Sequence, residues 1–501
     1  MNRGKVILVG AGPGDAGLLT LRGAAAIADA DTVVYDRLVS DEILDLIPDS
    51  SERIFVGKES GLHAVPQEEI NEILLRCALD GKLTVRLKGG DSFLFGRGGE
   101  ELELLAAHGI PFEIVPGITS AFAAPAYAGI PVTHRDFCSS VHIITGHARE
   151  NCELSIDFDA LVKTKGTLVF LMSISTMDAI TSGLIAAGIE PQMPAAVIEN
   201  GTRPSQRVTL GTVSDITGLA CKRAVKSPAL LVVGKVCSLH KGFDWFGALP
   251  LKGRRIVVTR PRDRAGTLTA RLRALGAESM SYPCIETRHI EHNTAAEKTL
   301  QSLNNYEWLA LTSPQGVASL SQLLDTADLD ARSLAAVKIA AIGSETAAAL
   351  RKIGLRADYV PTEFNATALS NGLSRLVSNG KRVLIFRAAE GTPDLCEILW
   401  NNGIDYDDIA VYTTHFTSNK SEAVAAAIHR GEIDFVCFTS VSTVRGFTQS
   451  FSGVDFNGLK AVCIGASTEK EAKKHGFSTA TPPNATLDGM INVLIQELEV
   501  N

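Results

Sequence analysis

An internal repeat in the C-terminal half limits the folds open to this chain. GRRIVVTR at Gly253–Arg260 returns as GKRVLIFR at Gly380–Arg387, and EWLALTS at Glu307–Ser313 returns as DFVCFTS at Asp434–Ser440 with the same separation. A third pair, VKIAAIGSETAAALRKIG and LKAVCIGASTEKEAKKHG, follows in the same order. Strand–turn–helix units can resemble one another by chance, but the agreement in spacing and order favours a duplicated α/β lobe.

The N-terminal half also alternates short Val/Ile/Leu runs with helix-length segments, as in VILVG, LLTLRGAAAIADA and TVVYD. This alternation is typical of α/β folds with mainly buried strands. The segment GFDWFGALPLKG, residues 242–253, places aromatic residues and a Gly/Pro cluster between two strand-like runs. We therefore predict one domain at residues 1–245, a linker at 246–252 and a second domain at 253–501.

The composition excludes several classes of function. A length of 501 residues corresponds to about three folding units. A net charge of −8 and an aromatic share of 6% argue against binding of polyanions or single-stranded nucleic acid. The nine cysteines are scattered and never spaced C-x-x-C, which suits a reducing cytoplasm and no metal site. The N-terminus lacks the apolar run of a signal peptide, and the prolines within residues 114–133 argue against a membrane span.

Glycine-rich turns follow the predicted strands of the N-terminal half. In VILVGAGPGDAGLL, residues 6–19, glycines permit positive φ and close approach of a ligand. Asp15 stands where a dinucleotide-binding fingerprint requires glycine, so a plain tight turn is an equal alternative. RLKGGD at 86–91 and the following SFLFGRGGEE contain five glycines, which predicts a loop whose amides, with Asp91, bind a polar small molecule.

Polar residues also follow strands at other places. Asp36, in YDRLVS, comes directly after the strand TVV, and Lys58 follows a Val-Gly pair. Side chains at the carboxyl ends of strands point into the ligand crevice of an open α/β sheet, although Asp36 can instead be a solvated loop carboxylate or a helix N-cap. The small residues of PGITSA permit close packing of a ligand, and Arg135 after His134 can meet an anion or simply be solvated.

Together these motifs carry a family resemblance. Residues 4–240 resemble the uroporphyrinogen-III C-methyltransferases of the tetrapyrrole methylase superfamily in VGAGPGDAGLLTL, YDRLVS, RLKGGD, FGRGGEEL, VPGITSA and AYAGIPVTHRD. The resemblance implies an enzyme that uses S-adenosylmethionine. It also implies two α/β lobes with the site between them, and a homodimer formed through this half.

The resemblance further implies roles for individual residues. Asp36 matches the proton acceptor of the family and Lys58 the proton donor. Ser92 stands where the family usually has proline, and Ser173 where it has glycine, so we expect altered loop stiffness and unchanged chemistry. The positions that match contacts with S-adenosylmethionine are Pro13, Gly89, Gly90, Asp91, Leu94, Thr119, Ser120, Met172 and Gly201.

The expected chemistry suits these residue types. Methyl transfer from a sulfonium is an in-line displacement, so positioning of the reactants matters most. As a pyrrole carbon attacks, positive charge develops on the ring and a proton must leave, which a carboxylate such as Asp36 can stabilise and accept. The tetrapyrrole substrate carries many carboxylates, and we expect Lys58 first, then Arg97 and Arg135, as local counter-charges.

The duplicated half resembles uroporphyrinogen-III synthase in GRRIVVTRP, LTSPQGV, FTSVSTV, AIGSETAAAL and VYTT. The resemblance implies two flavodoxin-like lobes, at 253–285 plus 415–496 and at 288–410, joined by a two-stranded ladder. It implies ring closure of hydroxymethylbilane without a cofactor in the cleft between the lobes.

Tyr412 matches a family tyrosine proposed to assist loss of the hydroxyl group of hydroxymethylbilane. Arg260 and Arg387 are repeat-related and are predicted anion contacts or structural salt bridges. Hydroxyl groups at strand ends and helix starts suit carboxylate binding, although each of them can instead be an N-cap. They belong to Thr312, Ser313, Ser344, Ser440 and Thr468.

We therefore predict a bifunctional, cytoplasmic enzyme of tetrapyrrole biosynthesis, the route to siroheme and cobalamin. It cyclises hydroxymethylbilane to uroporphyrinogen III and methylates this product twice, at C-2 and C-7, to precorrin-2. One alternative makes the C-terminal half a non-catalytic ligand-binding module, which failure of residues 250–501 to convert hydroxymethylbilane would favour. Another is an enzyme of the methylase fold with a different substrate, which methylation of RNA would favour.

Overall fold

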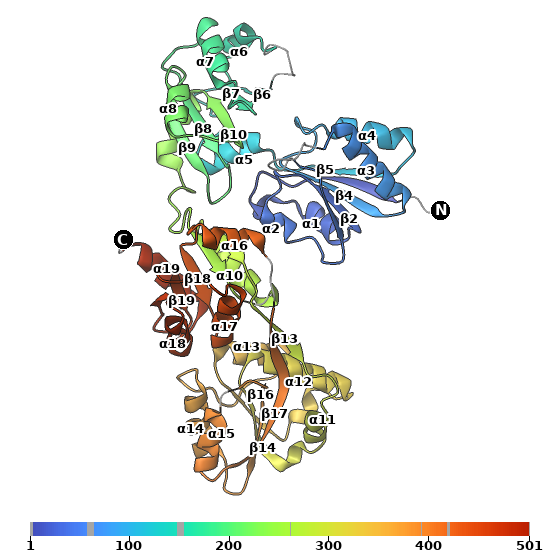
Figure 1. Ribbon diagram of the computed structural model, residues 1–501, viewed down its shortest axis with the longest axis vertical. Helices are drawn as coiled ribbons and strands as arrows, with labels where there is room; N and C mark the ends of the chain where they lie inside the picture. Colours follow the sequence, from blue (N-terminus) through green and yellow to red (C-terminus); the bar gives the residue numbers. More distant parts are fainter. Residues whose placement is uncertain are drawn as a thin grey trace. The chain divides into compact units, whose positions relative to one another are not determined.

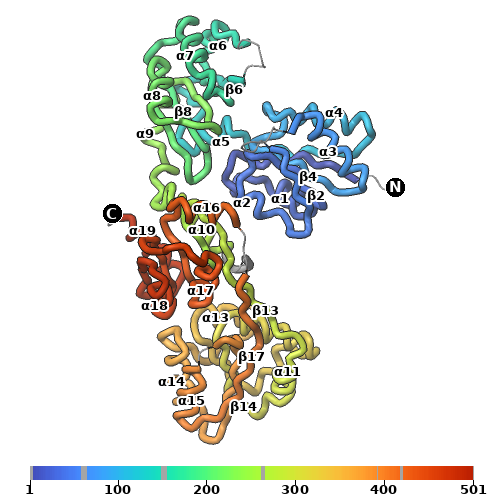
Figure 2. The backbone as a smooth tube through the Cα atoms, in the orientation of Figure 1, coloured from blue at the N-terminus to red at the C-terminus, as the bar shows by residue number. Residues whose placement is uncertain are grey.

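The computed structural model describes residues 4–57, 65–147, 155–260, 262–391, 393–417 and 421–499. The chain forms two compact units, Met1–Gly253 with Leu275–Glu278 and Arg254–Ala274 with Ser279–Asn501 (Figures 1 and 2). Each unit contains two five-stranded sheets flanked by helices, so the predicted α/β class is confirmed. Among the described residues, no helix combines the length and the apolar character needed to cross a membrane.

The first lobe of the N-terminal unit is a parallel sheet with the order β3-β2-β4-β1-β5. Its strands are β1 (Lys5–Gly10), β2 (Thr32–Tyr35), β3 (Glu52–Phe55), β4 (Leu83–Lys88) and β5 (Phe112–Val115). Helices α1 (Leu21–Ala28) and α2 (Asp41–Leu44) pack on one face, and α3 (Gln67–Leu79) and α4 (Gly98–Ala107) pack on the other. Because the strands are parallel, the loops after β1, β2, β4 and β5 meet at one edge.

The second lobe has a mixed sheet with the order β6-β7-β10-β8-β9. Its strands are β6 (Val141–Thr145), β7 (Thr167–Leu171), β8 (Pro194–Glu199), β9 (Arg207–Thr212) and β10 (Ala229–Val233). The helices of this part are α5 (Ser120–Tyr127), α6 (Phe158–Thr164), α7 (Met177–Ala186), α8 (Ile216–Lys222) and α9 (His240–Phe243). The proline-containing stretch 114–133 thus forms the end of β5, the short helix α5 and loops.

The C-terminal unit repeats one arrangement of strands, as the internal repeat predicts. One sheet has the order β12-β11-β18-β19-β20 and the other β13-β17-β16-β14-β15. The repeated segments form β11 (Arg255–Val258) and β16 (Arg382–Ala388), then β18 (Phe435–Phe438) and β14 (Tyr306–Leu311), then β19 (Lys460–Cys463) and β15 (Lys338–Ala341). In each sheet these strands lie in the same order and pair in parallel. Sequence copies therefore occupy equivalent places.

A two-stranded antiparallel ladder connects the two copies of this arrangement. Strand β13 (Ile285–His289) pairs with the second half of β17 (Asp405–Phe416), in the register Ile285 opposite Phe416. The remaining strands are β12 (Glu278–Ser281) and β20 (Ser478–Ala480). The helices are α10 (Arg262–Ala274), α11 (Thr294–Gln301), α12 (Pro314–Thr326), α13 (Ser344–Lys352), α14 (Ala366–Leu376), α15 (Asp394–Asn401), α16 (Glu422–His429), α17 (Val441–Ser450), α18 (Ala466–Lys474) and α19 (Leu487–Glu499).

Candidate functional site

A cavity of about 700 Å³ lies in the N-terminal unit at the loop edge of the parallel sheet. Both lobes contribute to its lining. All nine positions expected at S-adenosylmethionine lie around it: Pro13, Gly89, Gly90, Asp91, Leu94, Thr119, Ser120, Met172 and Gly201. Asp36 and Arg97 line the same cavity. The structure thus gathers residues that are spread over much of the N-terminal half, while their contacts with a ligand stay predictions.

Glycines bring three strand ends of the first lobe into backbone contact. Gly12 and Gly90 exchange two hydrogen bonds, with N···O distances of 3.0 and 2.7 Å. A Cβ on Gly117 would lie 2.2 Å from the Gly90 carbonyl oxygen and 2.6 Å from the Gly10 Cα atom. Gly90 itself has φ +70° and open space on its Cβ side. Only glycine fits this close approach, which leaves room for a ligand beside the loop.

Asp91 shapes the loop that follows β4. Its Oδ1 atom accepts hydrogen bonds from the Phe93 and Leu94 amides at 2.9 and 3.0 Å, and its Oδ2 atom accepts one from the Gly117 amide at 3.0 Å. Both carboxylate oxygens are therefore engaged by backbone. The expected contact of Asp91 with the amino-acid part of the cofactor stays a prediction, and the structure adds a role in tying the loop to the end of β5.

Replacement of Gly117 by alanine tests this arrangement. Because the new Cβ meets backbone atoms rather than a flexible side chain, the loop at 89–91 must shift. A shift of about 1 Å in positioning costs about 10²-fold in rate, so we expect a loss of that size in kcat/KM for the methyl transfer that the sequence predicts. Gly99→Ala is the matched control, because a Cβ at Gly99 meets nothing within 4 Å. Equal rates for the two variants would show that the close approach is not needed.

Positive φ values at non-glycine residues gather around the cavity. Phe95, Arg97, Met172 and Asn200 line the cavity and have φ values of 56°, 59°, 53° and 50°. Such conformations cost about 1–3 kcal/mol each and persist only where the surroundings impose them. Their concentration here supports a functional role for these loops.

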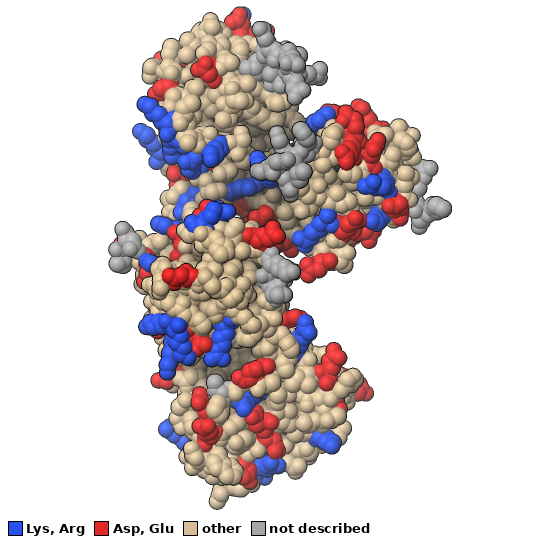
Figure 3. Space-filling view, viewed as in Figure 1, with Lys and Arg blue, Asp and Glu red and all other residues tan. Residues whose placement is uncertain are grey.

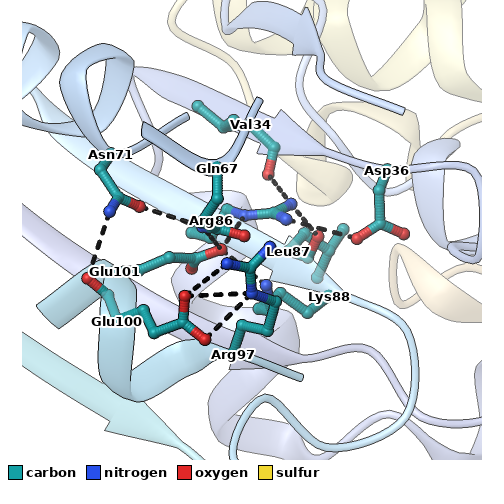
Figure 4. A network of polar contacts seen from close by, with 10 residues as sticks. All are labelled: Val34, Asp36, Gln67, Asn71, Arg86, Leu87, Lys88, Arg97, Glu100 and Glu101. Carbon is teal, nitrogen blue, oxygen red and sulfur yellow. Dashed lines mark hydrogen bonds and ion pairs between the residues drawn. The ribbon is translucent and has the colours of Figure 1, made fainter. Parts of the chain in front are cut away.

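A buried ionic network lies beneath Asp36 (Figure 4). Glu101 of α4 is fully buried, and its Oε1 atom accepts hydrogen bonds from Lys88 Nζ at 2.6 Å and Arg86 Nε at 3.2 Å. Gln67 adds a third donor at 3.3 Å. Arg86 Nη2 also lies 3.4 Å from Asp36 Oδ2. Arg86 and Lys88 lie two positions apart along β4. Their side chains therefore leave the same face of the sheet, toward α4.

This network sets the charge on one side of the cavity. Burial, together with the nearby Arg86, lowers the pKa of Lys88, whereas Glu101 opposes that shift. Asp36 keeps contact with solvent, with 24% of its side chain exposed. Its Oδ1 atom accepts a hydrogen bond from the Leu38 amide at 3.0 Å. The carboxylate is thus oriented by Leu38 and Arg86 and faces the cavity that it lines.

The other predicted residues of the N-terminal half lie elsewhere. Lys58 falls outside the described residues, so its predicted role as proton donor stays untested. Arg97 stands at the cavity but pairs with Glu100, Nη2 to Oε2 2.5 Å, and both side chains are about half exposed. Arg135 is exposed in the loop after α5 and is not among the residues that line the cavity.

In the C-terminal unit, Tyr412 is 8% exposed and shares a hydrogen bond of 2.8 Å with Ser313 Oγ. Ser313 also caps α12 by accepting from the Gly316 amide at 3.0 Å, and Ser440 caps α17 in a capping box. Thr312 is half-buried just before Ser313, Ser344 is the first residue of α13, and Thr468 is 2% exposed within α18. Helix capping, the alternative kept open above, therefore applies at Ser313 and Ser440.

The repeat-related arginines of this unit form ion pairs. Arg387 Nε donates to Asp408 Oδ1 at 2.7 Å, and Arg260 Nη2 lies 3.8 Å from Glu345 Oε2. Of the two roles predicted for these arginines, the structure shows the salt bridge.

The fold and the cavity define a class of protein, a methylase-type α/β unit followed by a bilobal α/β unit. Comparison with protein families agrees, because the model of the Tetrapyrrole (Corrin/Porphyrin) Methylases matches residues 5–217. The model of Uroporphyrinogen-III synthase HemD matches residues 266–492. The porphyrin biosynthesis protein HemD of Ruminiclostridium josui is 49% identical over 496 residues, which cover 99% of this chain and 98% of that protein.

The chain therefore belongs to the family of that porphyrin biosynthesis protein, with a tetrapyrrole methylase domain followed by a uroporphyrinogen-III synthase domain. It is an enzyme of tetrapyrrole biosynthesis with a methyltransferase-like part and a synthase-like part. The siroheme synthase of Salmonella typhi is 55% identical over 245 residues, 49% of this chain and 53% of that protein. A uroporphyrin-III C-methyltransferase of Thermus thermophilus, solved with S-adenyl homocysteine, is 36% identical over 46% of this chain and 93% of its own, with a TM-score of 0.41.

Proposed function

We propose that the N-terminal unit methylates uroporphyrinogen III twice with S-adenosylmethionine, at C-2 and C-7, to give precorrin-2. We propose that the C-terminal unit makes this uroporphyrinogen III from hydroxymethylbilane. The observation that carries the first proposal is that all nine expected cofactor positions and Asp36 surround one cavity. The match of the whole chain to a porphyrin biosynthesis protein supports the pairing of the two activities.

The residues around the cavity suit S-adenosylmethionine. This molecule has an adenine base with apolar ring faces and a charged amino-acid part. Leu94, Met172 and Pro228 offer apolar walls, and Thr119 and Ser120 offer hydroxyl groups. The absence of a side chain at Gly90 leaves open space next to the loop amides. When bound, the cofactor supplies an activated methyl group on its sulfonium.

The chain itself positions the reactants and moves the proton. The walls of the cavity hold the attacking pyrrole carbon in line with the methyl group. Asp36 stabilises the positive charge that develops on the ring and accepts the proton that leaves. Arg86, beside Asp36 Oδ2 at 3.4 Å, orients the carboxylate. Lys58 remains our proposed proton donor.

The direct test supplies purified protein with uroporphyrinogen III, with and without S-adenosylmethionine, under reducing conditions. We expect a product with two added methyl groups that forms only with the methyl donor. Absence of methylated product would overturn the proposal for the N-terminal unit. Methylation of RNA instead would select the alternative substrate class.

For the synthase activity we propose that Tyr412 assists loss of the hydroxyl group of hydroxymethylbilane. The hydroxyl of Tyr412 is held by Ser313 Oγ at 2.8 Å, next to the N-terminus of α12, where amides and hydroxyls suit carboxylates. We expect Tyr412→Phe to lower the rate of uroporphyrinogen III formation by about 10²-fold, the lower end of the range for a lost general acid. Methylation of added uroporphyrinogen III should stay unchanged. A synthase rate equal to that of the wild type would remove Tyr412 from the mechanism.

We also propose a homodimer formed through the N-terminal unit and a cytoplasmic location. Large apolar side chains that remain exposed in this unit, such as Phe112 and Phe122, support the first. The eight described cysteines form no disulfide, which suits a reducing compartment. Light scattering should give twice the monomer mass, whereas a monomer mass would exclude the dimer.

A further inference from the structure

Arg203 links the two lobes of the N-terminal unit at the cavity. It follows Gly201 in the loop between β8 and β9 and lines the cavity together with Asp36. Its Nη2 atom donates a hydrogen bond of 2.9 Å to the carbonyl oxygen of Leu38, two residues after Asp36. A cation from the second lobe is therefore held beside the loop that carries the proposed proton acceptor.

Two neighbours hold Arg203 in place. The stem of its side chain lies against Gly14, where a Cβ would come within 2.7 Å of the arginine Cγ atom and 2.8 Å of Nε. Lys252 Nζ donates to the carbonyl oxygens of Arg203 and Pro204 at 3.1 and 2.5 Å. Backbone and stem are thus both supported, so the guanidinium group is oriented before a ligand arrives.

The charge of Arg203 forms no ion pair with a described residue. Within the described parts of the chain, no carboxylate lies at ion-pair distance from its guanidinium group, and the carboxylates that stabilise its charge, Asp41, Glu278 and Glu42, act from farther away. Burial accordingly lowers the pKa of Arg203. A half-buried cation that has no ion-pair partner among the described residues is incompletely compensated, which points to a partner that the ligand supplies.

Two other half-exposed or buried cations at the cavity have acidic partners, whereas Arg37, which also lines it, is exposed. At the cavity, Lys88 pairs with Glu101 at 2.6 Å, and Arg97 pairs with Glu100. Basic side chains also gather over α8 and β9 in Figure 3. There Arg207 donates to Glu199 Oε2 at 2.7 Å, and Arg223 donates to the Val208 carbonyl oxygen at 2.8 Å. Arg203 differs from these residues because it is half-buried, lines the cavity and has no ion-pair partner among the described residues.

We propose that Arg203 binds a carboxylate side chain of the tetrapyrrole substrate and thereby places the reacting ring beside Asp36. The proposal rests on the function proposed above. A guanidinium group matches a carboxylate with two parallel N–H donors. Among the described residues, only the Nη2 atom of Arg203 has a protein acceptor, so its other donors are available to a ligand. The amino-acid carboxylate of S-adenosylmethionine has the same chemistry. The contact of Arg203 with the Asp36 loop favours the substrate as its source.

Kinetics of the intact protein test the assignment. We compare Arg203→Met and Arg203→Lys with Arg76→Met, a control at an exposed arginine of α3. A hydrogen bond to a charged group, lost from a buried partner, changes affinity by about tenfold to a hundredfold. We therefore expect Arg203→Met to raise the KM for uroporphyrinogen III by that factor at saturating S-adenosylmethionine. The KM for S-adenosylmethionine should stay unchanged, and Arg203→Lys should show a smaller rise.

Three outcomes would overturn the assignment. An equal or larger rise in the KM for S-adenosylmethionine would show that Arg203 holds the methyl donor. A loss confined to kcat would show that Arg203 only positions the Asp36 loop. Unchanged kinetics in Arg203→Met would show that the residue has no role in binding. If the wild-type protein does not methylate uroporphyrinogen III at all, the proposed function fails and the assignment fails with it, a result distinct from the other three.

Discussion

We expect Asp36→Asn to lower the rate of the proposed methyl transfer by about 10²- to 10⁴-fold, the range for loss of a general base. Asparagine preserves the shape of the side chain and can still accept from the Leu38 amide, which now binds Asp36 Oδ1 at 3.0 Å. It cannot take a proton, and it removes the negative charge that stabilises the developing cation. The effect should appear in kcat, with the KM for S-adenosylmethionine nearly unchanged, in a single-turnover measurement of methylated product.

The same protein provides the control for folding. Cyclisation of hydroxymethylbilane by Asp36→Asn should equal that of the wild type, because Asp36 belongs to the N-terminal unit. Asp29→Asn, at an exposed carboxylate after α1, should methylate at the normal rate. A methylation rate for Asp36→Asn within tenfold of the wild type would exclude Asp36 as the proton acceptor.

We expect Glu101→Gln to destabilise the N-terminal unit by about 3–5 kcal/mol, the cost of removing one partner from a buried ion pair. Glu101 is fully buried and faces Lys88 and Arg86, at 2.6 and 3.2 Å from its Oε1 atom. Without the carboxylate, both cations remain buried with less compensation. Calorimetry of the intact chain should show a lower unfolding temperature for the N-terminal unit.

The loss of stability in Glu101→Gln should depend on pH in a defined direction. The pKa of Lys88 is already lowered by burial and by Arg86, and Glu101 opposes that shift. In Glu101→Gln the pKa of Lys88 in the folded state falls further, while the pKa of Lys88 in the unfolded chain stays near its ordinary value. The unfolded chain then binds more protons than the folded one, so stability rises with pH. The loss of stability in Glu101→Gln relative to the wild type should therefore become smaller as the pH rises.

Two further variants separate charge burial from other effects. Glu100→Gln removes the neighbouring carboxylate, whose pair with Arg97 is about half exposed, and should cost at most about 1 kcal/mol. Glu101→Gln combined with Lys88→Met should recover part of the loss, because it removes an uncompensated cation. Equal effects of Glu100→Gln and Glu101→Gln would contradict the account of the buried network.

Much of the fold follows from patterns that the sequence displays directly. The repeated segments around Arg255 and Arg382 predict equivalent strands, and β11 and β16 occupy equivalent places in the two sheets. The glycine-rich turn and the loop at 86–101 predict a ligand site at one edge of a sheet, and their residues line the cavity. Such features are local, because they depend on strand period, turn chemistry and the lack of a side chain at glycine.

The contacts between distant segments were not predictable in the same way. Arg86 and Lys88 stand in a recognised motif, but their pairing with Glu101 depends on how α4 packs across the sheet. Asp91 was expected at the cofactor, and only the structure shows that its oxygens bind three backbone amides. Arg203 was not predicted as a site residue, although its position two residues after Gly201 was a usable signal. That no described carboxylate pairs with Arg203 becomes visible only in the folded structure.

In the proposed function, one chain performs two consecutive steps. Purified wild-type protein is incubated with hydroxymethylbilane, with and without S-adenosylmethionine, and the products are identified by absorbance and mass. We expect uroporphyrinogen III without the methyl donor and a dimethylated product with it. Formation of only the uncatalysed type I ring in the absence of the methyl donor would contradict the claim.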